Sequence, residues 1–507
     1  MKKFYKFIIC ITILALFLIP SSAYAWEGEC GYEGGISSQT SPGSTTGKIT
    51  YQYQEVSFIT GQPIVYTGTL TISKSTKQGS VVATYVYNLA NTANKATLVR
   101  TIVYNTVLTQ ADNGQTTEQT SFSKTPTEVI KIGNTTYSLK SYTFTRANIV
   151  DAKPAVNYYS GNTWGKKTYQ IGTGTNAGTV EVEGTGNFYG YDQYWGNTEV
   201  GVIDYTIQSD NGKDKWGGTA NVKVTSTSAK KIDYVKNQPD QISFDGGYLM
   251  TQDNSSVLSY DSMLPEFDSK GISTDNVLEK TDSLKLETFP SQTRLPVVSL
   301  AYLKGYWAEN DIKTLFSLGV FKNTGTKFNP QQFITRGEFA AAMANAAKAV
   351  PTDPTLAKKT TTTKKNTQQQ VVSPFADVST DSIYFTGIND AYNRGIFLGS
   401  DGGYFRPNDN ITVAEAVTTF IRALGLENMA PQPNAVTSFR DNDKIPAYAR
   451  NAVYVASDIG LVQGDDRGYL NPNNKLTNAQ AAVMLNRLIQ YAQNGISKDY
   501  IENIINY

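Results

Sequence analysis

Histidine is absent from this chain of 507 residues, and cysteine occurs only twice, at Cys10 and Cys30. The absence of histidine excludes a Ser-His-Asp triad, a Cys-His pair and histidine metal ligands. The 45 basic and 44 acidic side chains nearly cancel, so charge gives no argument for nucleic-acid binding. Phosphate-binding loops, dinucleotide-binding motifs and metal-binding cysteine clusters are also missing. We therefore expect a protein that is not an enzyme and uses no cofactor, no metal and no nucleic acid.

Long apolar segments are missing too, except at the N-terminus. Residues 2–6 include three lysines, residues 7–19 are almost entirely apolar, and Ala23-Tyr24-Ala25 offers a small-x-small cleavage site. Because a bilayer span takes about 20 apolar residues, we predict a secretory signal peptide at residues 1–25. After cleavage Cys30 would have no second cysteine for an intramolecular disulfide. We expect a secreted protein without a membrane span.

Tyrosine, glycine, threonine, serine and asparagine are abundant, and residues 26–228 are predicted to form a β-rich module. Ile49, Tyr51 and Tyr53 alternate with polar neighbours, and similar runs are separated by Gly, Asn and Asp turns. No helical periodicity lies between these runs, which favours an antiparallel sandwich or barrel. The alternation is lost over residues 229–295, which we predict to be a linker.

A helical pattern begins near Pro296, and one sequence unit then occurs three times. In each unit an apolar residue precedes a threonine, and a glutamate or glutamine follows three residues later. This arrangement before an apolar-periodic stretch predicts a capping box at the start of a helix. Three equivalent copies indicate a repeat. The cap residues, to which we assign a structural role, are Thr335, Glu338, Thr412, Glu415, Thr477 and Gln480.

The first half of each unit also recurs, as a helix that ends at a glycine: Gly319, Gly395 or Gly460. We therefore divide the sequence after the linker into five predicted segments. They are repeat one (296–350), a low-complexity polar insert (351–371), repeat two (372–430), repeat three (431–494) and a C-terminal tail (495–507).

The repeats resemble the S-layer homology (SLH) domain, three tandem copies of which commonly anchor bacterial exoproteins to the cell wall. Residues 1–295 match no family that we can name. The resemblance implies an α-helical, pseudo-threefold body whose inter-repeat grooves bind secondary cell-wall polysaccharide, often pyruvylated. The motifs that carry it are Trp307-Ala308-Glu309, Ile334-Thr335-Arg336-Gly337-Glu338, Phe375-Ala376-Asp377-Val378, Tyr404-Phe405-Arg406-Pro407 and Phe439-Arg440-Asp441.

Arg336 is the main candidate for ligand binding, because it directly follows the first threonine cap. Its planar guanidinium could pair with the carboxylate of a pyruvyl ketal, and the helix N-terminus adds positive field. Val413 and Asn478 occupy the equivalent positions, so we expect one competent groove. The alternative for Arg336 is an ordinary surface arginine. The candidates for stacking on sugar rings are Trp307, for which helix packing is the alternative, Tyr384 and Tyr448.

We interpret the chain as a secreted surface protein that the repeats anchor non-covalently to cell-wall polysaccharide. The β-rich module would be presented as an S-layer or adhesin component, with self-association in a surface lattice as one option. The alternative is a wall-anchored, carbohydrate-active enzyme with catalytic carboxylates in the β-rich module. Glu181 and Glu183 share one strand face but give little support, because exposed acids on outer faces are common. The aromatic run 188–195 could be a sugar platform or core packing.

Overall fold

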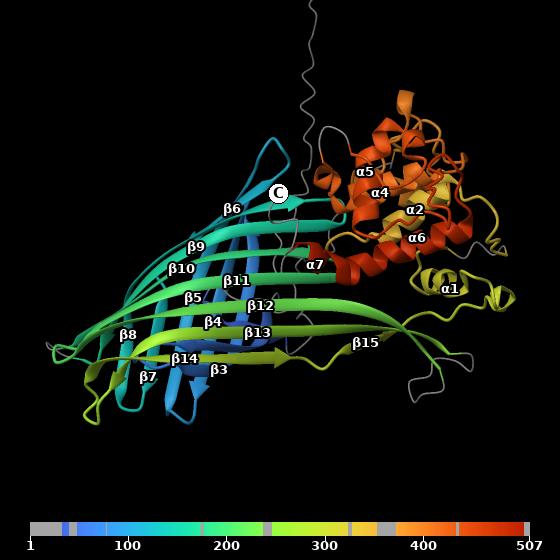
Figure 1. The fold of residues 1–507 in the computed structure, drawn as a ribbon. Coiled ribbons are helices and arrows are strands. Elements are labelled where there is room, and N and C mark those ends of the chain that lie inside the picture. Colours follow the sequence, from blue (N-terminus) through green and yellow to red (C-terminus); the bar gives the residue numbers. More distant parts are fainter. Residues whose placement is uncertain are drawn as a thin grey trace, which may run out of the picture.

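The computed structural model describes residues 33–39, 48–77, 79–173, 177–236, 246–322, 327–351, 372–431 and 435–500. The predicted signal peptide and all but the first residue of the predicted polar insert lie outside these residues. The described chain forms a β-module followed by a helical body, and the two parts are in contact (Figure 1).

The β-module is one antiparallel sheet of 15 strands. Thirteen of them follow the order β1-β2-β3-β4-β5-β6-β8-β9-β10-β11-β12-β13-β14, while β7 pairs with β5 and β8, and β15 pairs with β13. The strands are β1 (Ile36–Gln39), β2 (Lys48–Ser57), β3 (Ile64–Lys77), β4 (Ser80–Asn91), β5 (Ala96–Gln110), β6 (Thr116–Phe122), β7 (Thr127–Ile132), β8 (Thr135–Ala152), β9 (Val156–Ile171), β10 (Gly178–Gln193), β11 (Gly196–Asp210), β12 (Lys215–Val235), β13 (Gly247–Phe267), β14 (Ser273–Glu287) and β15 (Ser291–Arg294).

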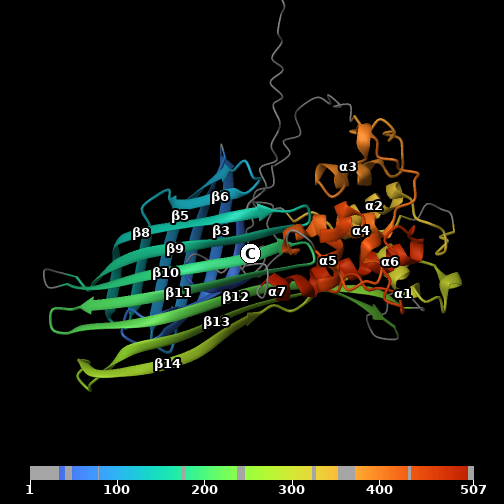
Figure 2. The ribbon, with the colours of Figure 1, turned by 45° about the horizontal axis from the view of Figure 1, so that its top comes forward.

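The sheet is rolled into a barrel-like shape, in which the early strands cross behind the late ones (Figures 1 and 2). Apolar side chains from both halves form one core, in which Tyr53, Tyr85 and Tyr104 are fully buried. Strand β1 closes the roll, because it pairs with β2 and its Ser37 carbonyl accepts a 2.9 Å hydrogen bond from Ser256 on β13. The prediction of an all-β N-terminal module is confirmed.

The prediction of a linker at residues 229–295 is wrong. This stretch contains the end of β12 and all of β13, β14 and β15. β14 is exposed over nearly its whole length, and polar residues lie on both of its faces. Period-two alternation arises only where one face of a strand is buried and the other is not. The sequence of β14 therefore lacks the signal that identified the earlier strands.

The helical body contains two main helices in each predicted repeat. They are α1 (Glu309–Ser317) and α2 (Arg336–Ala346), α3 (Phe385–Asn393) and α4 (Val413–Leu424), and α5 (Arg450–Asp458) and α6 (Asn478–Gln490), with α7 (Ile496–Asp499) after them. Gly319, Gly395 and Gly460 follow the first helix of each pair with φ of 69°, 76° and 73°, a left-handed conformation that suits glycine at a helix end. Within the described residues, no helix has the length and apolar character needed to cross a membrane.

The β-module docks on the C-terminal ends of α2 and α4. The Trp195 indole N–H donates to the Ala346 carbonyl at 2.8 Å, and the Tyr158 hydroxyl donates to the Leu424 carbonyl at 3.2 Å. The Ala155 N–H donates to the Ala423 carbonyl at 3.0 Å. Helix C-termini leave such carbonyls unpaired, so the rim of the β-module supplies the missing donors.

Two further residues extend this junction. The Arg394 guanidinium donates to the Pro154 carbonyl at 3.0 and 2.9 Å and to the Ala347 carbonyl at 2.6 Å. Tyr500, in the predicted tail, stacks on Tyr158 with ring centroids 5.7 Å apart. One apolar core therefore runs from the β-module into the helical body.

Candidate functional site

The three predicted caps have the geometry of complete capping boxes. The Thr335 hydroxyl oxygen accepts the Glu338 N–H at 3.2 Å, and Glu338 Oε2 accepts the Thr335 N–H at 2.9 Å. The same two bonds form between Thr412 and Glu415 and between Thr477 and Gln480. Each pair satisfies two backbone donors that the helix start leaves open.

The residues immediately before the caps hydrogen-bond to one another in a closed ring. The Ile334 N–H donates to the Leu476 carbonyl at 3.0 Å, the Leu476 N–H to Ile411 at 3.0 Å, and the Ile411 N–H to Ile334 at 3.3 Å. The first N–H groups of α2, α4 and α6 likewise donate to the loops before α4, α6 and α2, respectively. The three repeats therefore meet cyclically at their caps.

Two aspartates in the recognised motifs hold these loops. The Asp377 carboxylate accepts the N–H groups of Phe405 and Arg406 at 2.8 and 2.7 Å. Asp441 accepts those of Leu470 and Asn471 at 2.9 and 2.8 Å. Arg406 and Asn471 have φ of 60° and 57°, a left-handed conformation that is strained for a non-glycine residue. The aspartates therefore stabilise an unfavourable backbone turn before the caps of α4 and α6.

Arg336 lies between repeats and is only 8% exposed. Its Nη1 is 2.6 Å from Glu415 Oε1, and its Nε donates to the Phe405 carbonyl at 3.1 Å. Glu415 therefore does more than cap α4, because Oε2 serves the cap and Oε1 pairs with the arginine. Sequence reasoning missed this pairing, since the two residues are 79 positions apart.

Tyr448 lies beside the same carboxylate. Partial burial raises the pKa of its hydroxyl, and the negative charge of Glu415 adds to the shift. The ring is 60% exposed. Arg336, Glu415 and Tyr448 thus bring repeats one, two and three together, and two of the four predicted ligand-binding residues lie at this contact.

Tyr384 lies in a different groove, between repeats one and two. Its hydroxyl donates to Glu338 Oε1 at 3.0 Å, so Glu338 also uses one oxygen for its cap and one for a neighbouring repeat. Burial and the Glu338 charge raise the pKa of Tyr384 to about 12. The hydroxyl therefore remains a hydrogen-bond donor at neutral pH.

A cavity of about 660 Å³ opens beside Tyr384. Its lining includes Tyr302, Lys322 and Lys327, which sequence reasoning missed. Lys327 Nζ lies 4.5 Å from the centroid of the Tyr302 ring, within the range of a cation–π contact. The only sequence signal was that these lysines closely follow the motif Gly319-Val320-Phe321.

Trp307 belongs to neither groove. Its side chain is 63% exposed, which excludes the alternative that it packs in a helical core. It lies just before α1, and α1 contacts α6 through a 2.7 Å hydrogen bond from Asn486 to Asp311. The structure therefore separates Trp307 from Arg336, Tyr384 and Tyr448.

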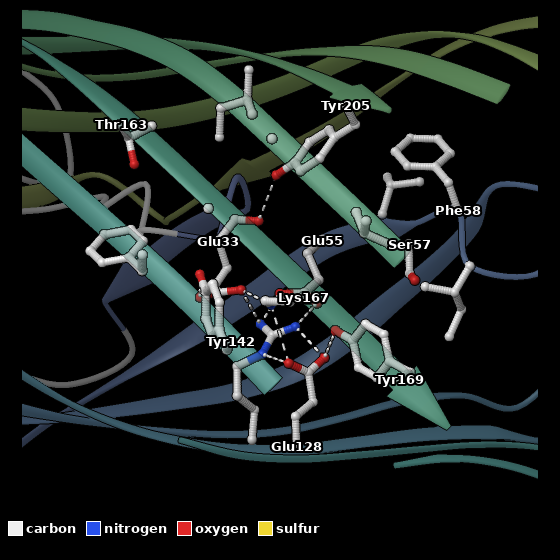
Figure 3. Close-up of a pocket in the computed structure, with 18 residues that line it drawn as sticks. Glu33, Glu55, Ser57, Phe58, Glu128, Tyr142, Thr163, Lys167, Tyr169 and Tyr205 are labelled. Atoms are coloured by element: carbon white, nitrogen blue, oxygen red, sulfur yellow. Dashed lines mark hydrogen bonds and ion pairs between the residues drawn. The ribbon is translucent and has the colours of Figure 1, made fainter. Parts of the chain in front are cut away.

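The β-module contains a buried ion network (Figure 3). Arg100 makes two hydrogen bonds to Glu55, at 2.8 and 2.9 Å, and two to Glu128, both at 2.9 Å. Lys167 pairs with Glu33 and Glu128. Burial opposes ionisation of Glu128, but the charges of Arg100 and Lys167 outweigh it and lower its pKa to about 2.

The cavity beside this network measures about 80 Å³. Ligand pockets usually measure about 300–1,000 Å³, so it is too small for a sugar chain. On the sheet surface Lys166 Nζ lies 3.0 Å from Glu181 and 4.0 Å from Glu183. Within the aromatic run, Tyr191 and Trp195 are buried at the junction and offer no open sugar platform.

A family model for the S-layer homology domain matches residues 303–340, 374–417 and 438–482. Each matched segment lies inside one of the three predicted repeats. The resemblance inferred from the motifs is thereby confirmed, and the C-terminal region carries three such domains.

Curated relatives include two glycoside hydrolases and a surface-layer protein. They are exoglucanase XynX of Acetivibrio thermocellus, 28% identical over 215 residues (42% of this chain, 18% of the relative), amylopullulanase of Thermoanaerobacterium thermosulfurigenes, 29% identical over 195 residues (38% and 10%), and the surface-layer 125 kDa protein of Lysinibacillus sphaericus, 25% identical over 217 residues (41% and 17%). The chain thus matches less than a fifth of the length of each of these relatives.

Proposed function

Because the helical body carries three S-layer homology domains, we propose that it anchors the protein non-covalently to secondary cell-wall polysaccharide on the outside of a bacterial cell. The role is binding rather than catalysis. The observation that carries the proposal is the cavity of about 660 Å³ between repeats one and two, with Tyr302, Tyr384, Lys322 and Lys327 in its wall. Aromatic faces suit sugar rings, and the ammonium groups suit an anionic substituent such as a pyruvyl carboxylate.

The three domains form a pseudo-threefold body in this proposal. The closed ring of hydrogen bonds among Ile334, Ile411 and Leu476 supports it, as does the cyclic contact of each helix start with another repeat. The caps lie at the N-terminal ends of α2 and α4, whereas the β-module docks at their C-terminal ends. The cap surface would therefore face the wall while the β-module is presented away from it.

The contact among Arg336, Glu415 and Tyr448 is a second region that we propose for ligand binding. We assign the ligand carboxylate to the remaining guanidinium nitrogen, Nη2, because Nε and Nη1 bind Phe405 and Glu415. Glu415 already neutralises part of its charge. We therefore place the main anionic contact at the lysine-lined cavity and a supporting contact at Arg336.

We favour binding over the enzymatic alternative. The carboxylates of Glu55 and Glu128 are bound to Arg100 beside a cavity too small for a sugar chain. Presentation of the β-module, as an S-layer or adhesin component, is the role that we propose for the rest of the chain.

Cosedimentation of the full chain with purified walls tests the anchor. We expect binding to walls that keep their polysaccharide and loss of binding once that polymer is extracted. Replacing both Lys322 and Lys327 with alanine should weaken binding at least tenfold, which is about 1.4 kcal/mol. Lys304→Ala, an exposed lysine outside the cavity wall, is the matched control and should bind normally. Equal binding to polymer-free peptidoglycan would refute the proposal.

A further inference from the structure

Strand β1 closes the β-module from the inside. Among the described residues its backbone pairs only with β2, over the four residues Ile36–Gln39. Its contact with the other end of the sheet runs through side chains, because Ser256 on β13 donates to the Ser37 carbonyl and in turn lies 2.7 Å from the Ser226 hydroxyl on β12. Both serines are buried on the strand faces that carry the apolar core. The closure therefore depends on a short segment that lies against the inner face of the late strands.

Glu33 connects the start of this segment to four strands (Figure 3). Its carboxylate accepts hydrogen bonds from the hydroxyls of Tyr104 on β5 and Tyr142 on β8, at 3.2 and 3.0 Å. The same carboxylate pairs with Lys167 on β9, and its side chain is only 3% exposed. The Tyr205 hydroxyl on β11 donates to the Glu33 carbonyl oxygen at 3.4 Å. One residue before β1 therefore holds early and late strands together from the interior.

Two glycines let the chain pass from Glu33 to β1. Gly34 has a φ of 75°, and a Cβ atom at this position would lie 2.8 Å from the Tyr205 hydroxyl oxygen on β11. At Gly35 a Cβ atom would overlap the Tyr53 hydroxyl on β2. Only a residue without a side chain fits such close approaches of backbone to neighbouring groups. The segment therefore passes tightly between a tyrosine of an early strand and a tyrosine of a late one.

The ion network does not need Glu33 for its charge balance. Arg100 makes its four hydrogen bonds with Glu55 and Glu128, whereas its distance to the Glu33 carboxylate is 3.7 Å. Lys167 also pairs with Glu128, at 3.2 Å. Two cations thus face two carboxylates before Glu33 adds a third negative charge. The main cost of breaking a buried ion pair is the unpaired charge that stays behind, and departure of Glu33 leaves both cations with a carboxylate.

We propose that residues 33–39 form a latch, pinned by Glu33, which leaves and re-enters the interior of the β-module while the other strands stay folded. Detachment breaks the four-residue pairing with β2, the bonds of Glu33 and Ser37, and the burial of Ile36. Strand β2 keeps its ten-residue pairing with β3. Local openings of this kind cost less free energy than global unfolding. The latch opens the interior beside the ion network, and it does not depend on wall binding.

Hydrogen exchange of the full chain, with Cys30→Ser as background throughout, tests whether the latch opens alone. We expect the amides of β1 to exchange at least about tenfold faster than those of β9, which is paired on both sides. Glu33→Ala should speed β1 by at least about tenfold more and leave β9 unchanged. Glu128→Ala is the comparison variant, because it takes a carboxylate from both Arg100 and Lys167 and should speed both strands. Equal exchange of β1 and β9 in the background protein, or an equal response of both to Glu33→Ala, would overturn the proposal.

A disulfide that holds the latch in place tests the same motion. Ser38 and Gln52 are opposed in the β1–β2 pairing, and opposed Cα atoms lie about 4.5–5.5 Å apart, within reach of a disulfide. Oxidised Ser38→Cys with Gln52→Cys should return β1 exchange in Glu33→Ala to within about threefold of the protein that keeps Glu33. Thr50→Cys with Thr71→Cys joins β2 to β3 instead and should leave β1 fast. Circular dichroism and thermal melts would check that each variant is folded. Exchange of β1 that both disulfides slow alike, or that neither slows, would contradict the proposal.

Discussion

Arg336 shows how one largely buried side chain can join three repeats. It belongs to repeat one, bonds to Phe405 and Glu415 of repeat two, and lies near Tyr448 of repeat three. Arg336→Ala would leave Glu415 Oε1 without its partner. Because hydrogen bonds to charged groups contribute about 1.5–3 kcal/mol, we expect the free energy of unfolding to fall by that amount in denaturant titrations.

Asn478→Ala is the matched control, since it alters the equivalent position in repeat three. Its amide makes one neutral 2.9 Å hydrogen bond to the Asn329 carbonyl, so the loss should be about 0.5–1.5 kcal/mol. Arg336→Lys should recover only part of the stability, because an ammonium lacks the planar fork. If the alanine and lysine variants were as stable as the original, the pairing with Glu415 would be energetically irrelevant.

Asp192 makes the stability of the folded protein depend on pH, and the direction of this dependence can be predicted. It is buried in the β-module, and Oδ1 has no partner among the described residues. Burial raises the pKa of its carboxyl well above the usual value, and the charges of Glu199 and Glu118 add to the shift. The folded state thus binds a proton that the unfolded state releases above about pH 4, so this group lowers stability as pH rises.

Asp192→Asn should remove this dependence. We expect the variant to be more stable than the original protein by at least about 1 kcal/mol at pH 8 and to differ little at pH 4. The measurement is the difference between the two proteins in thermal or chemical unfolding across this range. Taking the difference cancels the opposite trend of Glu128, whose pKa is lowered to about 2. A constant difference at all pH values would contradict the assignment.

At the scale of elements, features that depend on residues close together in the sequence were predictable, whereas features that depend on distant residues were not. The capping boxes and the left-handed Gly319, Gly395 and Gly460 depend on residues within about one helical turn, so the sequence pattern identified them. Strand β14 escaped because its exposure on both faces removes alternation. Strand β13 escaped because its buried face includes Ser256 and Ser262, whereas Val257 and Met263 are exposed. The pairing of Arg336 with Glu415 depends on how repeats assemble, which no short pattern contains.

The candidate site shows the same difference between short-range and long-range features. Tyr448 was found because it occupies the repeat position of Trp307, and Tyr384 because it is adjacent to that position in repeat two; each lies beside a cap glutamate. Lys322 and Lys327 were missed because they follow no repeat pattern and become neighbours of Tyr384 only when two repeats pack together. Repeat position therefore predicted candidates, while folding decided which candidates share a groove.

At the scale of the whole molecule, the junction makes the β-module and the helical body mechanically continuous. Trp195 is 1% exposed and belongs to the core that both parts share. Arg394 bridges Pro154 of the β-module and Ala347 at the end of α2. Shared burial couples the stability of the two parts, so we expect one cooperative unfolding transition in scanning calorimetry.

Trp195→Ala should break this coupling. Truncating a buried aromatic residue costs about 3–5 kcal/mol, and here the Ala346 carbonyl also loses its donor. We expect the single transition to broaden or split, with the helical body unfolding at the lower temperature because α2 has lost a cap. Arg394→Ala should act in the same direction, whereas Arg467→Ala, on an exposed turn away from the junction, should leave the transition unchanged. Two separate transitions in the original protein would show that the modules unfold independently, and that the β-module is tethered to the anchor rather than held by it.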